Sequence, residues 1–131
     1  MKTIKRNDLV YPDLSYQIYG CAFDVFAKIG DGHHEKVYQR ALAEAFKNRN
    51  ISFKEQVYYS IKYNNKPVGR DFFDFLVDDR VIVEIKKGNR YSKTHIDQVL
   101  NYLKINNLKL AIIVNFASDG ADCKRIINLI S

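Results

Sequence analysis

The segment FFDFLVDDRVIVEIKK, residues 72–87, constrains the fold more than any other part of the sequence. It is rich in Phe, Val and Ile, which favour β-strands, and residues 78–80 interrupt it with a polar stretch typical of a turn. We therefore predict an antiparallel hairpin. Its strands also contain Asp74, Glu84 and Lys86, charged side chains whose presence among β-forming residues needs an explanation.

Loop length decides which residues of this hairpin face each other. A three-residue loop places Asp74 directly opposite Glu84, with their Cβ atoms about 5 Å apart, a spacing at which like charges are destabilising. Lys86 falls on the same face as Glu84 because side chains alternate along a strand. Two acids and a base on one face suit a Mg²⁺ or Mn²⁺ ion held by carboxylates, with a lysine to activate water or offset charge on a phosphate.

Two other interpretations of the hairpin stay open. It could be simply amphipathic, with Lys86 offsetting acids that face solvent. A two-residue loop would place Asp74 opposite Val83 and send the two acids to opposite faces. Asp71 is a rival acid on the first strand, on the other face from Asp74, and we prefer Asp74.

Periodicity predicts the remaining elements. Apolar spacing indicates two helices, over residues 14–29 after a cap at Asp13 and over 37–46, with GDG between them. Residues 51–63 read as a strand, and 94–107 as a helix with a capping box of Thr94 and Asp97. The apolar run 108–116 predicts a strand buried on both faces, and 122–130 a closing helix. The order α-α-β-β-β-α-β-α indicates one α/β or α+β domain, residues 1–131, with helices flanking a central mixed sheet.

Charge and cysteine content narrow the class of protein. Lys and Arg number 21 against 15 Asp and Glu, a net charge of +6. This surplus favours a polyanionic partner such as nucleic acid, or is ordinary solubilising charge. We expect a cytoplasmic protein without a membrane span, since no signal peptide or long apolar run is present. Cys21 and Cys123 lack zinc-site spacing, and we expect both as reduced core thiols.

Two helices carry further polar residues of interest. Helical spacing places Glu35 of GHHEKVY, residues 32–38, within the apolar arc of its helix, where it needs a partner unless it complements the helix dipole. His33 and His34 point in different directions and are predicted as surface or capping residues. Gln98 and Tyr102 lie on one flank of the helix over 94–107, near His95. They could hold a substrate or a metal-bound water, or simply border the apolar stripe.

These features, in this order, resemble the small bacterial GxxExxY proteins, a branch of the PD-(D/E)XK nuclease superfamily with a restriction-endonuclease-like and RecB-like core. Gly32, Glu35 and Tyr38 match the residues that name the family, and VIVEIKK at 81–87 matches the strand with the E-x-K element. The resemblance runs from about Leu14 to the last element and includes IIVNF at 112–116. It implies a central mixed sheet flanked by helices, with an acidic site at one edge.

The resemblance also implies a role for each residue of the hairpin. Asp74 and Glu84 correspond to the acids that bind a divalent metal, and the backbone carbonyl of Ile85 completes the coordination. Lys86 corresponds to the lysine that assists the attack by water and stabilises the transition state. The implied cofactor is Mg²⁺ or Mn²⁺.

Further site residues are implied outside the hairpin. Glu35 matches a metal or water ligand of the RecB-like and phage exonuclease branches, whose Gln-x-x-x-Tyr helix faces the same site. Substrate contacts are predicted from Gln98, Tyr102, Tyr38 and Lys87. Basic residues near the motifs could bind the nucleic acid backbone or form a solvated face: Lys87, Arg90, Lys93 and Lys104. The loop YSKTH, residues 91–95, is predicted to face the substrate.

The sequence departs from the superfamily pattern in two places, because no Pro precedes Asp74 and there are too few cysteines for an iron–sulfur cluster. We predict a metal-dependent nuclease that hydrolyses phosphodiester bonds in DNA or RNA. The alternative is a nucleic-acid-binding or partner-binding module that keeps the fold but does not cleave. With 131 residues, little remains beyond the core to clamp a duplex, so a homodimer or a larger complex could supply further contacts.

Overall fold

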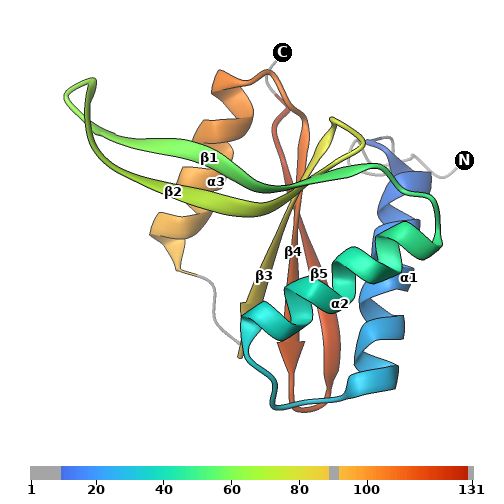
Figure 1. Cartoon of the computed structure of the whole chain (residues 1–131). Coiled ribbons are helices and arrows are strands. Elements are labelled where there is room, and N and C mark those ends of the chain that lie inside the picture. Colours follow the sequence, from blue (N-terminus) through green and yellow to red (C-terminus); the bar gives the residue numbers. More distant parts are fainter. Residues whose placement is uncertain (1–9, 89–91, 130–131) are drawn as a thin grey trace, which may run out of the picture.

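The computed structural model describes residues 10–88 and 92–129, which form an α+β fold with one mixed sheet. Helices α1 (Pro12–Ile29) and α2 (Glu35–Asn48) precede strands β1 (Phe53–Tyr63), β2 (Lys66–Val77) and β3 (Val81–Lys87). Helix α3 (Lys93–Ile105), β4 (Leu110–Ala117) and β5 (Gly120–Ile127) follow. The strands lie in chain order, and only β3 and β4 are parallel. Helices α1 and α2 cover one face and α3 the other (Figure 1).

The hairpin of β2 and β3 has the register expected from a three-residue loop. Val77 pairs with Val81, and the ladder continues to Phe75 opposite Val83. The loop closes through a hydrogen bond from the Arg80 nitrogen to the Val77 carbonyl, 2.9 Å long. The two-residue alternative is therefore excluded, and Asp74 and Glu84 come level with each other just beyond the last regular pair.

The last element is a strand, so the predicted closing helix over 122–130 is wrong for the residues that the structure describes. A tight turn at 118–119 brings Gly120 opposite Ala117, and β5 then pairs antiparallel with β4. Its apolar residues divide between the two faces of the sheet: Cys123 and Ile127 pack toward α1 and α2, and Ile126 toward α3. A short apolar run does not distinguish a helix from a strand, and here the open edge of β4 supplies the backbone partners that decide it.

The helix caps also differ from the sequence prediction. Helix α1 begins at Pro12, and Asp13 lies in its first turn, where its charge complements the helix dipole without capping it. At α3 the hydroxyl of Ser92, and not of Thr94, accepts the backbone N–H of His95 at 2.9 Å. Within the described residues, no helix is both long and apolar enough to cross a lipid bilayer.

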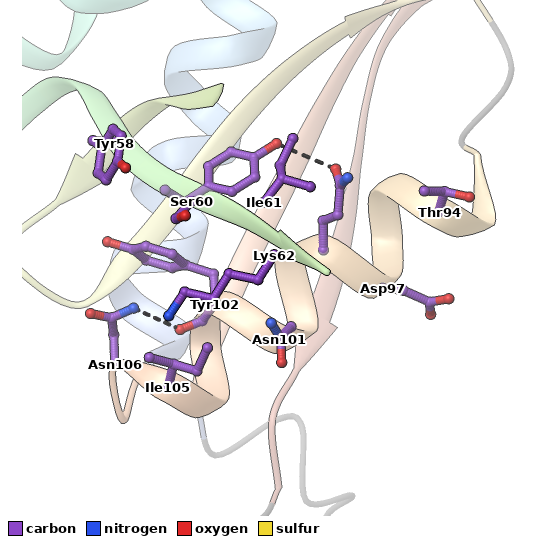
Figure 2. Close-up of a pocket in the computed structure, with 12 residues that line it drawn as sticks. Tyr58, Ser60, Ile61, Lys62, Thr94, Asp97, Asn101, Tyr102, Ile105 and Asn106 are labelled. Atoms are coloured by element: carbon purple, nitrogen blue, oxygen red, sulfur yellow. Dashed lines mark hydrogen bonds between the residues drawn. The ribbon is translucent and has the colours of Figure 1, made fainter. Parts of the chain in front are cut away.

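Strands β1 and β2 continue past the sheet as a two-stranded ribbon that lies over α3 (Figure 1). The ribbon twists sharply at Gln56, which has a φ of 54°. Gln56 is missing from the regular pairing, which passes from Glu55↔Phe75 to Val57↔Phe73. As a result Phe75 packs against α1 and α2, whereas Phe73, two residues away, packs against α3. Ile61 and Tyr102 line the groove that remains between the ribbon and the helix (Figure 2).

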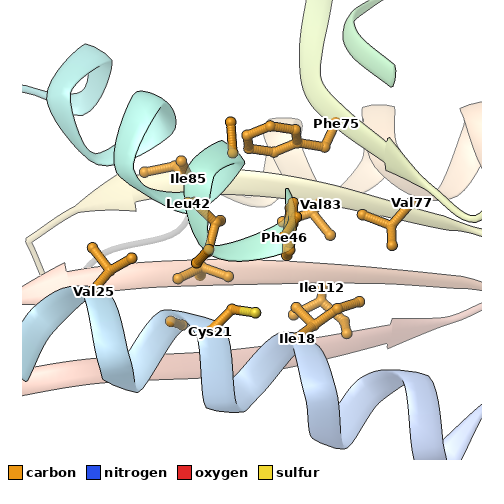
Figure 3. Packing of buried hydrophobic residues seen from close by; sticks show 14 of the residues in the cluster. Ile18, Cys21, Val25, Leu42, Phe46, Phe75, Val77, Val83, Ile85 and Ile112 are labelled. Carbon is orange, nitrogen blue, oxygen red and sulfur yellow. The ribbon is translucent and has the colours of Figure 1, made fainter. Parts of the chain in front are cut away.

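The larger core lies between the sheet and the two N-terminal helices. Figure 3 shows side chains of α1 and α2 meeting those of β2, β3 and β4, among them Ile18, Cys21, Leu42, Phe46, Phe75, Val83 and Ile112. Tyr38 belongs to this core. Its ring stacks on Phe116 at a centroid distance of 4.1 Å, and its hydroxyl donates to the Gly30 carbonyl at 2.6 Å.

We expect Tyr38→Phe to lower the free energy of unfolding by about 1 kcal/mol, because the Gly30 carbonyl loses its donor while the ring stays packed. Tyr38→Ala should cost about 3–5 kcal/mol through the cavity that it leaves. Urea unfolding followed by circular dichroism measures both. Tyr16→Phe is the matched control, since Tyr16 is 78% exposed on α1. Unchanged stability of Tyr38→Phe would contradict the structural role of this hydroxyl.

Both cysteines are free, and their surroundings make them poor nucleophiles. Burial raises the pKa of the Cys21 thiol, and burial together with the nearby Asp122 raises that of Cys123 to about 12. Because the thiolate is the reactive form, iodoacetamide at mildly alkaline pH should alkylate both residues slowly in the native protein and fast in urea. Mass spectrometry gives the two rates. Fast native labelling at either cysteine would contradict this account.

Candidate active site

The two acids predicted to face each other mark the point where β2 and β3 separate. The Asp74 N–H donates to Glu84 Oε1 at 3.0 Å, and the Ile85 N–H donates to Asp74 Oδ2 at 2.8 Å. Each carboxylate thus takes the place of a backbone carbonyl of the neighbouring strand. These crossed bonds satisfy peptide groups at the end of the ladder and fix both side chains in position.

A pocket of about 270 Å³ opens at this point between the hairpin, the start of α2 and the start of α3. Its wall is polar, because carboxyl, amide, ammonium and imidazole groups reach it from five elements. The lining residues are Glu35, Gln56, Asp71, Phe72, Asp74, Glu84, Ile85, Lys86 and His95. The pocket therefore brings together the predicted acids, the predicted lysine and three polar residues that the sequence analysis did not assign to the site.

Electrostatics in the pocket favour a cation. The Glu84 side chain is only 8% exposed. Burial, and after it the charge of Asp74 and the hydrogen bonding between the two, raises the pKa of Glu84 well above its ordinary value, while Lys86 acts in the opposite direction. Two adjacent acids with a single nearby ammonium are undercompensated, so a proton or a divalent ion would relieve the repulsion between them.

His95 does not supply the missing charge. Its Nε2 atom lies 3.4 Å from Glu84 Oε2, but the contact lacks hydrogen-bond geometry, and this buried nitrogen has no hydrogen-bond partner among the described residues. Burial, and after it the charge of Lys86, lowers the pKa of His95, so the imidazole is neutral at pH 7. Sequence reasoning named His95 only as a neighbour of Gln98. Its position in the first turn of a helix following the E-x-K strand was the available signal.

The three residues of GxxExxY have three different surroundings. Gly32 has a φ of 89°, which L side chains rarely adopt, so the turn between α1 and α2 favours glycine there. Tyr38 is fully buried in the core, which gives it no contact surface for the substrate that it was predicted to bind. Glu35 alone lines the pocket. It lies at the first position of α2, on the same side of the helix as the buried Leu42 and Phe46, and is exposed at the pocket margin because the core ends before it.

The remaining predicted substrate contacts lie away from this pocket. Lys87 is exposed at the end of β3, and strand alternation turns it to the face opposite Lys86. Gln98 and Tyr102 line the separate groove of about 540 Å³ between β1 and α3 (Figure 2). There the Tyr59 hydroxyl donates to Gln98 Oε1 at 3.3 Å. Of the predicted basic residues, Arg90 lies outside the described residues.

Asn115 is a further polar residue on the site face of the sheet. It stands opposite Lys86 in the parallel pairing of β3 and β4, is 4% exposed, and its Oδ1 atom has no hydrogen-bond partner among the described residues. In the sequence it lies within the apolar run of β4, where a single amide was the only signal. Asn115 and His95 leave two buried polar atoms unpaired on this side of the sheet.

The donor set suits a hard divalent ion better than zinc. Within residues 10–88 and 92–129, no three His, Cys, Asp or Glu side chains are grouped so that they could hold a metal ion by themselves, and a closed zinc site requires four such ligands. Mg²⁺ is commonly held by one or two carboxylates, with water and substrate phosphates as its other ligands. Asp74 and Glu84, fixed by the crossed hydrogen bonds, fit that arrangement.

Comparison with known proteins identifies the family. A family model described as the PD-(D/E)XK nuclease superfamily matches residues 12–126. This range includes Glu35, Asp74, Glu84 and Lys86. A solved structure, the crystal structure of SSO0001, is similar in fold, with a TM-score of 0.53 and 17% sequence identity over 74% of this chain and 51% of that one. The chain thus spans about half the length of that solved chain, and no curated protein matches the sequence. The chain belongs to the PD-(D/E)XK nuclease superfamily.

Proposed function

We propose that this protein is a Mg²⁺- or Mn²⁺-dependent nuclease of the GxxExxY branch, which hydrolyses phosphodiester bonds in DNA or RNA. The observation that carries the proposal is the pair of crossed hydrogen bonds that holds Asp74 and Glu84 side by side in a polar pocket beside Lys86. Superfamily membership supports the same chemistry. The net charge of +6 favours a polyanionic substrate.

Each residue has a specific task in this proposal. Asp74 and Glu84 would hold the divalent ion, with the carbonyl of Ile85 as a third ligand. The ion, when bound, supplies Lewis-acid stabilisation of the phosphate charge. Lys86 lies on the same face as Glu84 and would orient the attacking water or offset the charge that develops on the phosphate. Glu35, exposed at the pocket margin, would bind a water molecule or serve as a further ligand of the ion.

Metal binding gives the first test. Mn²⁺ should raise the free energy of unfolding by about 2.7 kcal/mol when its concentration is 100 times the dissociation constant. The gain should vanish in Asp74→Asn and Glu84→Gln, because each variant lacks one of the two carboxylates. In EDTA, Glu84→Gln should be at least as stable as the wild type, since the amide oxygen still accepts the Asp74 N–H and the repulsion is gone.

Thermal unfolding with Mn²⁺ or EDTA measures these effects. Glu44→Gln is the matched control, because Glu44 is an exposed acid of α2 that pairs only with Lys47 within the described residues, and it should keep the full metal response. Equal stabilisation of all four proteins by Mn²⁺ would mean that the ion binds somewhere else.

Cleavage gives the second test. The purified protein would be incubated with linear, circular and single-stranded DNA and with RNA, in Mn²⁺, Mg²⁺ or EDTA. Cleavage should require metal and fall by about 100-fold or more in Lys86→Ala and Glu84→Ala, the scale expected for removing a group that stabilises charge in a transition state. Cleavage of the circular substrate would identify endonuclease action.

Lys28→Ala controls for the loss of a lysine, because Lys28 is exposed on α1, pairs with Asp24 and does not line the pocket. Circular dichroism would verify that each variant is folded. If the wild type binds nucleic acid but cuts none of the substrates, the nuclease proposal fails, and the alternative of a binding module on the same fold replaces it.

A further inference from the structure

We infer that the outer face of the β1–β2 ribbon is a stacking platform for unpaired nucleobases, which holds single-stranded nucleic acid beside the acidic pocket. The ribbon is defined here as residues 57–63 and 66–73, the part of the hairpin that continues beyond β3 (Figure 1). Its outer face is the one turned away from α3. The inference rests on the proposed function and names the form of its substrate.

Two aromatic rings stand side by side on this outer face. Tyr58 and Phe72 are direct cross-strand partners, with ring centroids 6.0 Å apart at an interplanar angle of 67°. They are 54% and 41% exposed. The ribbon buries its other face against α3 through Tyr59 and Phe73, so its stability already has a source. The exposed pair lies outside both buried cores, and clustered exposed apolar groups of this kind mark interaction sites.

The charge around the rings selects a polyanion. Arg70 is exposed on the outer face, two pairs further along the ribbon than Phe72. Lys62 and Lys66 are exposed toward the tip, and the only acid of the ribbon is Asp71, whose side chain alternates to the α3 side. Aromatic rings flanked by cations are the combination that binds single strands, with the bases on the rings and the phosphates on the cations.

The platform is continuous with the candidate active site. Phe72 itself lines the acidic pocket together with Asp74 and Glu84. The Phe72 ring alternates to the outer face, opposite the pocket residue Asp71, so a strand stacked on the ring would pass the edge of β2 to bring a phosphate into the pocket. One strand would run from the cations near the ribbon tip, over Tyr58 and Phe72, to the carboxylates.

The chemistry of this face favours unpaired bases over a duplex. In a duplex the base faces are covered by their neighbours, and a ribbon that reads one uses polar side chains directed at base edges. Flat rings on an open sheet face instead stack against bases that are splayed out. Tyr58 and Phe72 present rings at the positions where a duplex reader would present hydrogen-bonding groups.

Fluorescence anisotropy in EDTA tests the inference without cleavage. The probes are a labelled single-stranded DNA, a single-stranded RNA and a duplex of the same sequence. The wild type should bind at least one of the single strands more tightly than the duplex. Tyr58→Leu and Phe72→Leu, which keep an apolar side chain but remove the ring, should each weaken that binding by about 5- to 100-fold.

Three controls separate stacking from other effects. Tyr58→Phe and Phe72→Tyr keep the ring and should keep the affinity. Tyr16→Leu removes a ring that is 78% exposed on α1 and should change nothing. Arg70→Ala should reduce the slope of log affinity against log salt by about 0.7, the value for one phosphate contact on a single strand.

The inference is overturned if the Leu variants bind single strands as the wild type does, or if the duplex binds more tightly than both single strands. Its failure is distinct from that of the nuclease proposal, because binding is measured with no metal present. Lost binding in the ring variants of a protein that cuts nothing would leave the platform and remove the nuclease. Normal binding in the ring variants of an active enzyme would remove the platform and leave the nuclease proposal standing.

Discussion

Two hydrogen bonds between side chain and backbone end the pairing of β2 with β3. Up to Phe75 and Val83 the strands β2 and β3 pair through their backbones; one step further, the carboxylates of Asp74 and Glu84 accept the peptide N–H groups instead. Side chains thus end the ladder without leaving its last donors unpaired. The hairpin of β1 and β2 is then free to leave β3 and cross to the other face, and the pocket opens in the space between them.

The same arrangement creates the need for a ligand. A ladder ended by two amides would satisfy the same N–H groups without placing like charges together. Burial, and after it the charge of Asp74, raises the pKa of Glu84, and Lys86 is an insufficient counter-charge. The site is in this sense preorganised for a cation at a cost in stability, as is common at functional sites. Phe72 and Asp74, on either side of the point where the ribbon twists, both contribute to the pocket wall.

Sequence reasoning reached this centre because hairpin pairing is local: loop length fixes the register, and the register places Asp74 level with Glu84. It failed where the structure depends on contacts between residues that are far apart in the sequence. The segment after Ala117 became a strand because the edge of β4 accepts it. Helical spacing could not tell that Tyr38 packs on Phe116, or that Gln98 lines a groove with β1 and does not line the acidic pocket. The chain matches the PD-(D/E)XK nuclease superfamily over residues 12–126. The residues Gly32, Tyr38 and Glu35, predicted together as one motif, lie in a turn, in the core and at the pocket margin.

The most direct measurement of the central claim is anomalous diffraction from crystals soaked in Mn²⁺. The account predicts one strong peak within bonding distance of carboxylate oxygens of both Asp74 and Glu84, with Lys86 beside it. A map in which these two carboxylates keep only their crossed hydrogen bonds, while Mn²⁺ binds elsewhere or not at all, would contradict the claim that the end of the ladder is a metal site.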